Sequence, residues 1–368
     1  MSTSPPDVPP TPPPPTAPGP GPGAAPDRPP PASPGPAAGA DSGSDSGPAV
    51  GPGRAFGPGP GPDSGPPVSR QEFDALFAAV RTWGRWEAAD RGAWNRVTPD
   101  HVRRAAALVR SGRTVRLGLP WNTRPEPDND KPALHYMSDL GDVEPPEPAT
   151  HKDFLGVDYH GKAVSHLDAL SHVAYRGLLY GGHPAREAVD AGGARFGSVA
   201  ALGPLVTKGV LLDLPAILGV DWLEPGRAVR ARDVLAAEAA LGVRIDDGSA
   251  VLLRCGRFRR RLELGPWDVG AASAGLHVDA VPLLAERAVS LLGGDGDSDV
   301  RPSPVEGVHS PVHALAVAGM GVPLLDNLDL EALAAACAET GRHEFMIVVA
   351  PLNVPGGTGS PVDPVAIL

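Results

Sequence analysis

The hydrophobic and polar positions divide the chain into a first segment without apolar periodicity and a longer segment with regular patterns. Residues 1–68 contain almost no large apolar side chains. From Ser69 onwards, SRQEFDALFAAVRTWGRW spaces Phe73, Leu76, Phe77 and Val80 along one face of a helix. The pattern therefore predicts that the folded chain begins near Ser69.

Strands and helices are predicted to alternate along the second segment. Thr98 suits the N-cap of a helix that has Pro99 at its first position and Gly112 after its last turn. Apolar runs predict strands at TVRLGLP (114–120), GVLLDL (209–214), AVLLRCG (250–256) and FMIVVAPL (345–352). Helical patterns lie near 231–241, 278–292 and 329–340, the last ending at Gly341. This interleaving predicts an α/β fold.

The composition of the first segment is typical of a disordered chain. Residues 1–68 hold 24 of the 46 prolines. Such a segment buries too little apolar surface to offset its ordering entropy, so we expect 1–68 to be a disordered Pro/Gly/Ala-rich tail. PPTPPPPTAPGP suits a proline-recognising module, although a plain spacer is the simpler interpretation.

Charge and cysteine content argue against several classes of protein. The net charge is −11 and no basic cluster is visible, which argues against binding to nucleic acid. Cys255 and Cys337 lie in apolar surroundings, and we expect buried free thiols. No stretch approaches the roughly 18 apolar residues of a membrane helix, and no secretory signal is visible. We therefore expect a cytoplasmic protein that does not bind membranes.

The segment DYHGKAVSHLDALSHVAYRG gathers three of the chain's 11 histidines around one aspartate. On a strand, His166 and Asp168 share a face, and a following turn brings His172 towards Asp168. His160 precedes Gly161, which gives the chain freedom to bend. Imidazole and carboxylate suit zinc, manganese or iron(II), so the spacing predicts half of a metal site. A hydrogen-bonded structural cluster is the alternative.

Further ligands would have to come from another part of the chain. GVHSPVHALAVAGMGVPLLDNLDLEAL offers His309, His313 and Asp326. Ala314 to Val322 is apolar, so His313 is expected at the edge of a buried element, whereas His309 suits a surface loop.

Two other motifs receive ordinary interpretations. GGDGDSDVRPSPVE spaces its acidic residues like a calcium loop, but Val300 stands where that loop needs glycine. RCGRFRRRLE is interpreted as a solvated turn, with Arg254 or Arg257 as an alternative contact for a substrate carboxylate.

Several motifs together resemble one family. HLDALSH resembles the H-x-D-x-P-x-H core of the cyclase family, which includes bacterial kynurenine formamidases and isatin hydrolases. TWGRWEAADRGAWNRVTPDHVRRAAALV and the last 59 residues of the chain, from SPVHALAVAGMG onwards, resemble one branch of it. The resemblance covers residues 70–368 and implies a swivelling β/β/α fold, so 69–368 is predicted to be the catalytic domain.

The resemblance also implies a metal-dependent hydrolase acting on an amide, formamide or lactone through a metal-activated water. N-formylkynurenine is the best-known substrate in the family. One or two zinc or manganese ions, a small-molecule substrate and a homodimer are expected. The resemblance implies that His160, His166 and Asp168 bind the first metal. Asp168 is then expected to bridge to a second metal, which His313 and Asp326 complete. His172 is the implied proton shuttle. Asp295 is expected near the mouth of the site.

Three positions depart from the family pattern. Lys162 occupies the place of the usual first histidine, so His160 has to reach the metal from a longer loop. Leu170 replaces the proline of the core, and Asp326 replaces a glutamate and reaches less far. Lys162 and Asp326 keep open the alternative of a non-catalytic binding protein with a degenerate metal site. A cyclase or dehydratase of secondary metabolism that uses the same site is the other alternative.

Overall fold

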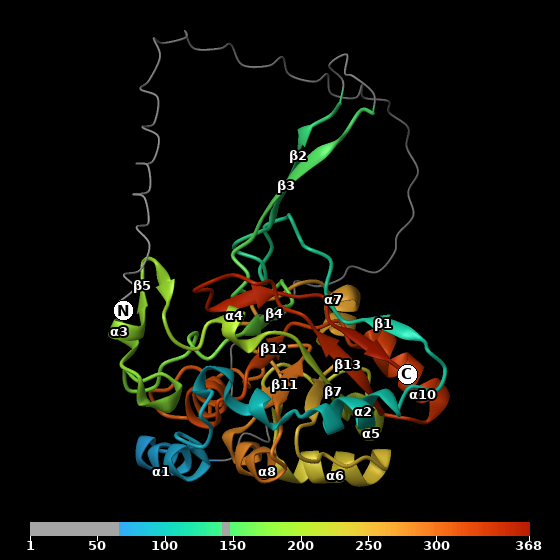
Figure 1. Cartoon of the computed structure of the whole chain (residues 1–368). Coiled ribbons are helices and arrows are strands. Elements are labelled where there is room, and N and C mark those ends of the chain that lie inside the picture. Colours follow the sequence, from blue (N-terminus) through green and yellow to red (C-terminus); the bar gives the residue numbers. More distant parts are fainter. Residues whose placement is uncertain (1–65, 142–147) are drawn as a thin grey trace, which may run out of the picture. The chain divides into compact units, whose positions relative to one another are not determined.

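The computed structural model describes residues 66–141 and 148–368 (Figure 1). Its contacts divide the chain into Met1–Ala55 and Phe56–Leu368, and all described residues belong to the second unit. Most of the predicted tail therefore lies outside the described residues. The folded part starts at Val68, whose N–H donates to Pro304 O at 2.8 Å.

A nine-stranded mixed sheet organises the described residues, in the order β1-β15-β13-β7-β9-β11-β12-β4-β14. The central neighbours β7, β9, β11 and β12 run parallel, and the flanking pairs are antiparallel. The strands are β1 (Thr114–Arg116), β4 (His166–Asp168), β7 (Leu205–Asp213), β9 (Ala250–Arg254), β11 (Leu291–Gly294), β12 (Leu324–Asp326), β13 (Glu344–Val349), β14 (Gly359–Pro361) and β15 (Val365–Ile367).

Helices and small sheets occupy the connections. The helices are α1 (Arg70–Val80), α2 (Pro99–Ala106), α3 (Ala185–Ala188), α4 (Val199–Leu202), α5 (Leu214–Leu218), α6 (Ala231–Leu241), α7 (Arg257–Leu264), α8 (Val281–Glu286), α9 (Pro311–His313) and α10 (Glu331–Thr340), with 3-10 turns at Ala89–Arg96, Tyr180–Gly182 and Val278–Ala280 and a π-helix at Ala314–Met320. The two-stranded sheets pair β2 (Leu134–Asp139) with β3 (Lys152–Gly156), β5 (Val189–Asp190) with β6 (Gly193–Ala194), and β8 (Ala228–Val229) with β10 (Gly275–Leu276).

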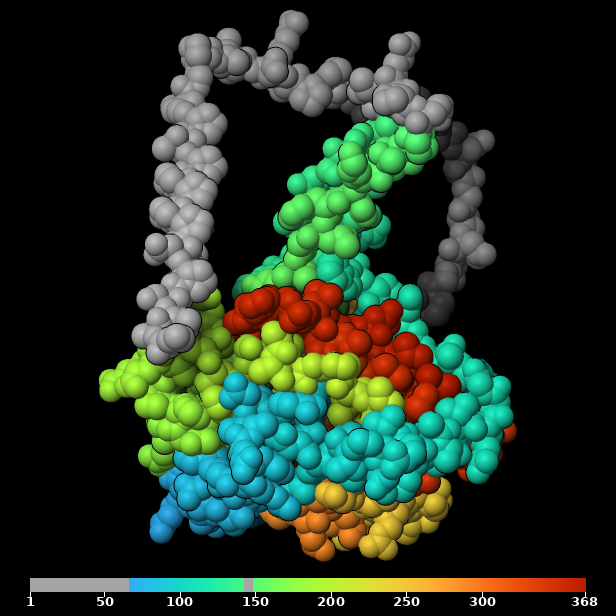
Figure 2. All heavy atoms as spheres, viewed as in Figure 1, coloured from blue at the N-terminus to red at the C-terminus, as the bar shows by residue number. Residues whose placement is uncertain are grey.

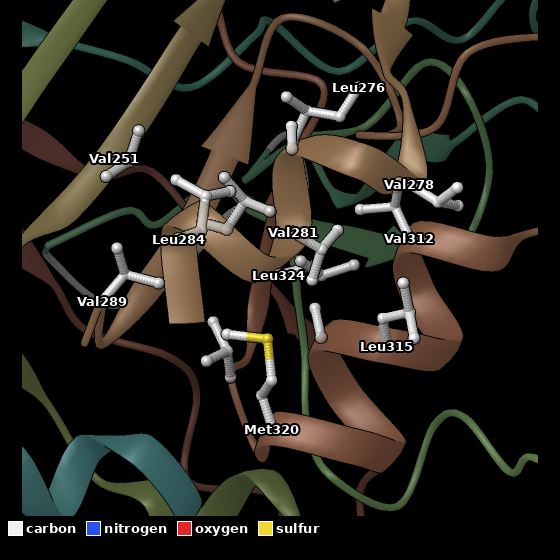
Figure 3. Packing of buried hydrophobic residues seen from close by; sticks show 14 of the residues in the cluster. Val251, Leu276, Val278, Val281, Leu284, Val289, Val312, Leu315, Met320 and Leu324 are labelled. Atoms are coloured by element: carbon white, nitrogen blue, oxygen red, sulfur yellow. The ribbon is translucent and has the colours of Figure 1, made fainter. Parts of the chain in front are cut away.

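Both faces of the large sheet are buried, so the fold is α/β as predicted. Along β7, Val210 and Leu212 join one apolar cluster while Leu211 joins another, as strand alternation requires. The first cluster includes side chains of α1, α6, α8 and the π-helix, and Figure 3 shows part of it around Leu284, Leu315 and Leu324. The second includes side chains of α4 and α10.

The helix predictions are confirmed at most of their ends. Ser69 caps α1 in a reciprocal pair of hydrogen bonds with Glu72, and α10 ends at Gly341 in the left-handed conformation. The second helix was predicted to run up to Gly112 but ends at Ala106. The chain turns there because the N–H groups of Ser111 and Gly112 bond to Leu368 O instead.

The helix predicted over 278–292 is wrong in its last part. The helical segment ends at Glu286, and Leu291 already belongs to β11. Leu291 and Leu292 would suit a buried helix as well as a buried strand. Their pairing with Ala250 and Val251 of β9 is what makes this segment a strand. Within the described residues, no helix combines the length and the apolar character that crossing a membrane requires.

Both cysteines are free and buried, which confirms their predicted state. Burial raises the pKa of the Cys337 thiol to about 12 and that of Cys255 well above its ordinary value. We expect Ellman's reagent to react with almost no thiol in the folded protein at mildly alkaline pH, and with both after unfolding in guanidinium chloride. Rapid reaction of one thiol in the native protein would contradict this packing.

Candidate metal centre

The pairing of β4 with β12 brings the predicted acidic and histidine residues onto one face of the sheet (Figure 1). His166 lies opposite Asp326, and Asp168 lies opposite Leu324. Leu167 and Leu325 point into the second apolar cluster. Alternation therefore turns the side chains of His166, Asp168 and Asp326 towards the other face, and all three are buried.

Asp168 lies at the centre of two groups of donor atoms. The donor atoms of His160, Asp168 and His172 lie within 4.8 Å of one another, and so do those of His166, Asp168 and Asp326. The described residues thus offer two candidate ligand groups for a divalent metal, and Asp168 belongs to both. The groups differ from the implied ligand sets, because His160 groups with His172 rather than with His166.

His313 joins the second group from the start of the π-helix. Its Nε2 lies 3.4 Å from Asp326 Oδ2 and 3.6 Å from Asp168 Oδ2. Burial lowers its pKa, but the carboxylates of Asp299 and Asp326 outweigh that effect and raise the pKa well above the ordinary value. The His313 imidazole therefore faces both buried carboxylates.

The rings of His166 and His313 are each held by a hydrogen bond at Nδ1. This bond turns the Nε2 atom of each ring towards the carboxylates. His166 Nδ1 bonds to Val164 O at 2.8 Å, and His313 Nδ1 bonds to Asp299 Oδ2 at 2.5 Å. Metal-binding histidines are commonly held in this way, by a carbonyl or carboxylate on the other ring nitrogen.

Two buried carboxylate oxygens have no hydrogen-bond partner within the described residues, Asp168 Oδ2 and Asp326 Oδ2. An unpaired buried carboxylate oxygen is costly unless a cation approaches it. Ser298 Oγ donates to Asp326 Oδ1 at 2.7 Å, which fixes the carboxylate with its other oxygen free. The residues present therefore fit a divalent metal.

His160 reaches the cluster in spite of its distance along the sequence. Its Nδ1 lies 2.9 Å from Asp168 Oδ1, and its ring stacks on His172 with centroids 3.8 Å apart. His160 Nε2 bonds to Thr358 Oγ1 at 3.1 Å. The longer loop thus brings the histidine to the site.

His172 follows the turn after β4 and lies at the pocket with its side chain 30% exposed. Burial lowers its pKa to about 4 in spite of the attraction of Asp168. Its Nε2 is 3.8 Å from Asp168 Oδ1, so the geometry allows His172 to be either a ligand or a base.

A cavity of about 320 Å³ opens in front of these residues. Lys162 and Arg301 also line it and both bond to Asp297, with Arg301 at 3.0 Å. Burial would raise the pKa of Asp297, but the charges of Lys162 and Arg301 lower it to about 2. Asp297 thus balances one of these two cations, while Asp168 and Asp326 bring negative charge to the same cavity. His309, predicted as a surface residue, lines it too.

The acidic run after β11 supplies contacts that the sequence did not reveal. Asp297 holds Lys162 and Asp299 holds His313, while Asp295 accepts backbone N–H groups of Cys255 and Gly256. Asp295 is absent from the residues that line the cavity, contrary to its expected place near the mouth. The run of three aspartates directly after an apolar segment was the available signal.

The arginine-rich segment is helical and partly buried rather than a solvated turn. Arg254 bonds to Asp213 at 2.8 Å and to Glu331 at 2.6 and 3.0 Å. Arg257 bonds to Asn327 at 2.6 Å. Both side chains are buried, and neither lines the cavity.

Comparisons with known proteins agree with this fold. A family model described as "Putative cyclase" matches residues 117–298. A crystal structure of a novel cyclase is 27% identical, with a TM-score of 0.72, and the match covers 79% of this chain and 99% of that one. These two matches support the membership of the cyclase family that the sequence motifs predicted.

Two isatin hydrolases share the fold at lower similarity. Isatin hydrolase A from Labrenzia aggregata is 21% identical with a TM-score of 0.50, covering 71% of this chain and 94% of that one. The enzyme from Ralstonia solanacearum is 23% identical with a TM-score of 0.50, covering 73% and 98%. The comparison with curated proteins finds no match.

We predict that Asp299→Asn weakens metal binding about 10- to 100-fold, because it loosens the orientation of His313. Titration of the metal-free protein with zinc or manganese against a competing chelator measures this affinity. Asp363→Asn is the matched control, since Asp363 pairs with Arg116 on the exposed edge of the sheet. Equal affinities in the two variants would show that Asp299 does not support the site.

Proposed function

We propose that the chain is a metal-dependent hydrolase that cleaves an amide, formamide or lactone bond of a small molecule. The observation that carries the proposal is the pair of buried carboxylate oxygens, on Asp168 and Asp326, that accept no hydrogen bond from the described residues and face the His313 imidazole beside a polar cavity. Membership of a family in which similar structures are titled isatin hydrolases supports the reaction class. Zinc and manganese are the proposed metals, since both accept imidazole and carboxylate ligands.

The chain's own residues would have two functions, to bind the metal and to transfer a proton. A bound divalent metal would lower the pKa of a water molecule and polarise a carbonyl group. Asp168, Asp326, His166 and His313 would hold it, with His160 beside Asp168. His172 is more exposed to the cavity than these residues and would carry a proton to the leaving amine or alkoxide.

Lys162 and Arg301 add a positive wall to the same cavity. The Lys162 ammonium is partly exposed, whereas Arg301 is almost fully buried. Lys162 is therefore the cation of this wall that a substrate can reach. This favours a substrate with a carbonyl or carboxylate group within reach of the scissile bond, as N-formylkynurenine has.

The direct test is hydrolysis by the full chain after loading with zinc or manganese. Isatin, N-formylkynurenine and simple lactones form the first panel. Turnover that disappears with a chelator and returns with metal supports the proposal. Stoichiometric metal binding without turnover on any of these classes would favour the non-catalytic binding protein, and conversion without net hydrolysis would favour the cyclase or dehydratase.

We predict that His172→Ala lowers kcat about 10²- to 10⁴-fold while the metal content stays at the wild-type level, because the proton shuttle is removed and the ligands remain. Turnover and elemental analysis are measured on the same preparation. His183→Ala is the control, since His183 is exposed and stacks on Phe196 outside the cavity. Loss of metal in His172→Ala would make His172 a ligand instead.

A further inference from the structure

One loop carries both His160 and Lys162 into the candidate site. This His160 loop, residues 157–165, follows the β2–β3 hairpin, which Figure 2 shows as a projection from the other described residues. The hairpin strands pair only with each other among the described residues, so sheet pairing does not hold the loop. Within those described residues, no backbone N–H donates to the carbonyl of Gly161, Lys162 or Val164. These carbonyl groups need other donors.

Asn327 supplies two of the donors. Its Nδ2 donates to Gly161 O at 3.0 Å and to Val164 O at 3.2 Å. Its own main-chain O accepts a hydrogen bond from Ser165 Oγ at 2.6 Å, and the residue is fully buried. Val164 O is also bonded to His166 Nδ1 at 2.8 Å. One amide group thus holds the loop at two points, and one of these points also orients a candidate metal ligand.

The backbone of Asn327 is left-handed, with φ at 58°, directly after Asp326. Glycine enters this region without strain, and asparagine is among the few other residues that tolerate it. Strained backbone of this kind concentrates at functional sites, where the surrounding structure holds it in place. The chain has an asparagine where glycine would fit the backbone better, which indicates that the amide itself is needed.

Arg257, at the start of α7, holds Asn327 and the loop from the other side. Its guanidinium donates to Asn327 Oδ1 at 2.6 Å and to the carbonyl of Lys162. The side chain is buried, with Asp128 at 3.9 Å. A planar guanidinium joins two acceptors in a fixed geometry. The three loop carbonyls therefore bond to buried side chains of α7 and of the residue after β12.

On the basis of the metal centre described above, we propose that Asn327 and Arg257 are positioning residues that hold the His160 loop in the site. Neither residue lines the cavity, so neither is assigned a contact with substrate. The loop carries the imidazole that lies 2.9 Å from Asp168 and the ammonium of Lys162 that lines the cavity. Release of the loop carbonyls is therefore expected to displace both groups and to weaken metal binding.

The first test is the metal affinity of Asn327→Gly, which keeps the left-handed backbone and removes the amide. The full chain is titrated with zinc or manganese against a competing chelator, and we expect an affinity about 10-fold below that of the wild type. Asn95→Gly is the matched control. Asn95 Nδ2 also donates to two backbone carbonyls, of Ala88 at 2.7 Å and Gly92 at 3.0 Å, but it does not bond to the loop. The control should keep the wild-type affinity.

A double-mutant cycle with His160→Ala separates positioning from a general loss of structure. If Asn327 acts through His160, Asn327→Gly should change the affinity less than about 2-fold once His160 is absent. Both variants are compared by the same titration, and circular dichroism should show that they keep the wild-type fold.

Cleavage by endoproteinase Lys-C tests the release of the loop without metal. Lys162 is a cleavage site inside the loop, and the exposed Lys152 in β3 is the internal reference. In the metal-free full chain, initial cleavage after Lys162 relative to Lys152 should be about 10-fold faster in Asn327→Gly than in the wild type, because local opening exposes the site.

An unchanged metal affinity in Asn327→Gly, an equal loss in both backgrounds of the cycle, or an unchanged cleavage rate at Lys162 would overturn the positioning role. A wild type that binds no metal would overturn the metal centre and the positioning role together. A wild type that binds metal, shows the expected cycle and hydrolyses no substrate would overturn the proposed activity and support the positioning role.

Discussion

The candidate site depends on the burial of two carboxylates beside each other at the junction of β4 and β12. Strand pairing fixes Asp168 and Asp326 on one face, and the apolar neighbours Leu167 and Leu325 prevent that face from turning outwards. Carboxylates buried at this depth require compensating positive charge. The histidines, and the metal that their inner nitrogens are turned to receive, supply that charge.

A single acidic run organises the surroundings of the two carboxylates. The acidic run after β11 sends Asp299 to His313 and Asp297 to Lys162 and Arg301. One strand end thus orients a metal ligand and also neutralises part of the positive wall of the cavity. A change in this run would alter the ligands and the substrate wall together.

Much of this arrangement could be predicted from local sequence. The spacing of His166, Asp168 and His172 predicts a shared face, and the resemblance adds His313 and Asp326. The roles of these residues, and the extent of the domain and tail, remain predictions. Asp299 was missed because its partner is 14 residues away along the chain and the acidic spacing resembled a calcium loop. β2 and β3 show no clear strand signal in the sequence, because their apolar residues are exposed and belong to a hairpin that projects from the core.

The most direct test of the metal centre is the metal content per chain of the wild type and of Asp168→Ala, purified without chelators or metal-affinity columns. Asp168 is the residue common to both groups of donor atoms. The account predicts at least one equivalent of zinc or manganese in the folded wild type and the loss of bound metal in the variant. A variant that keeps the wild-type metal content, or a wild type that binds no metal when loaded, would contradict it.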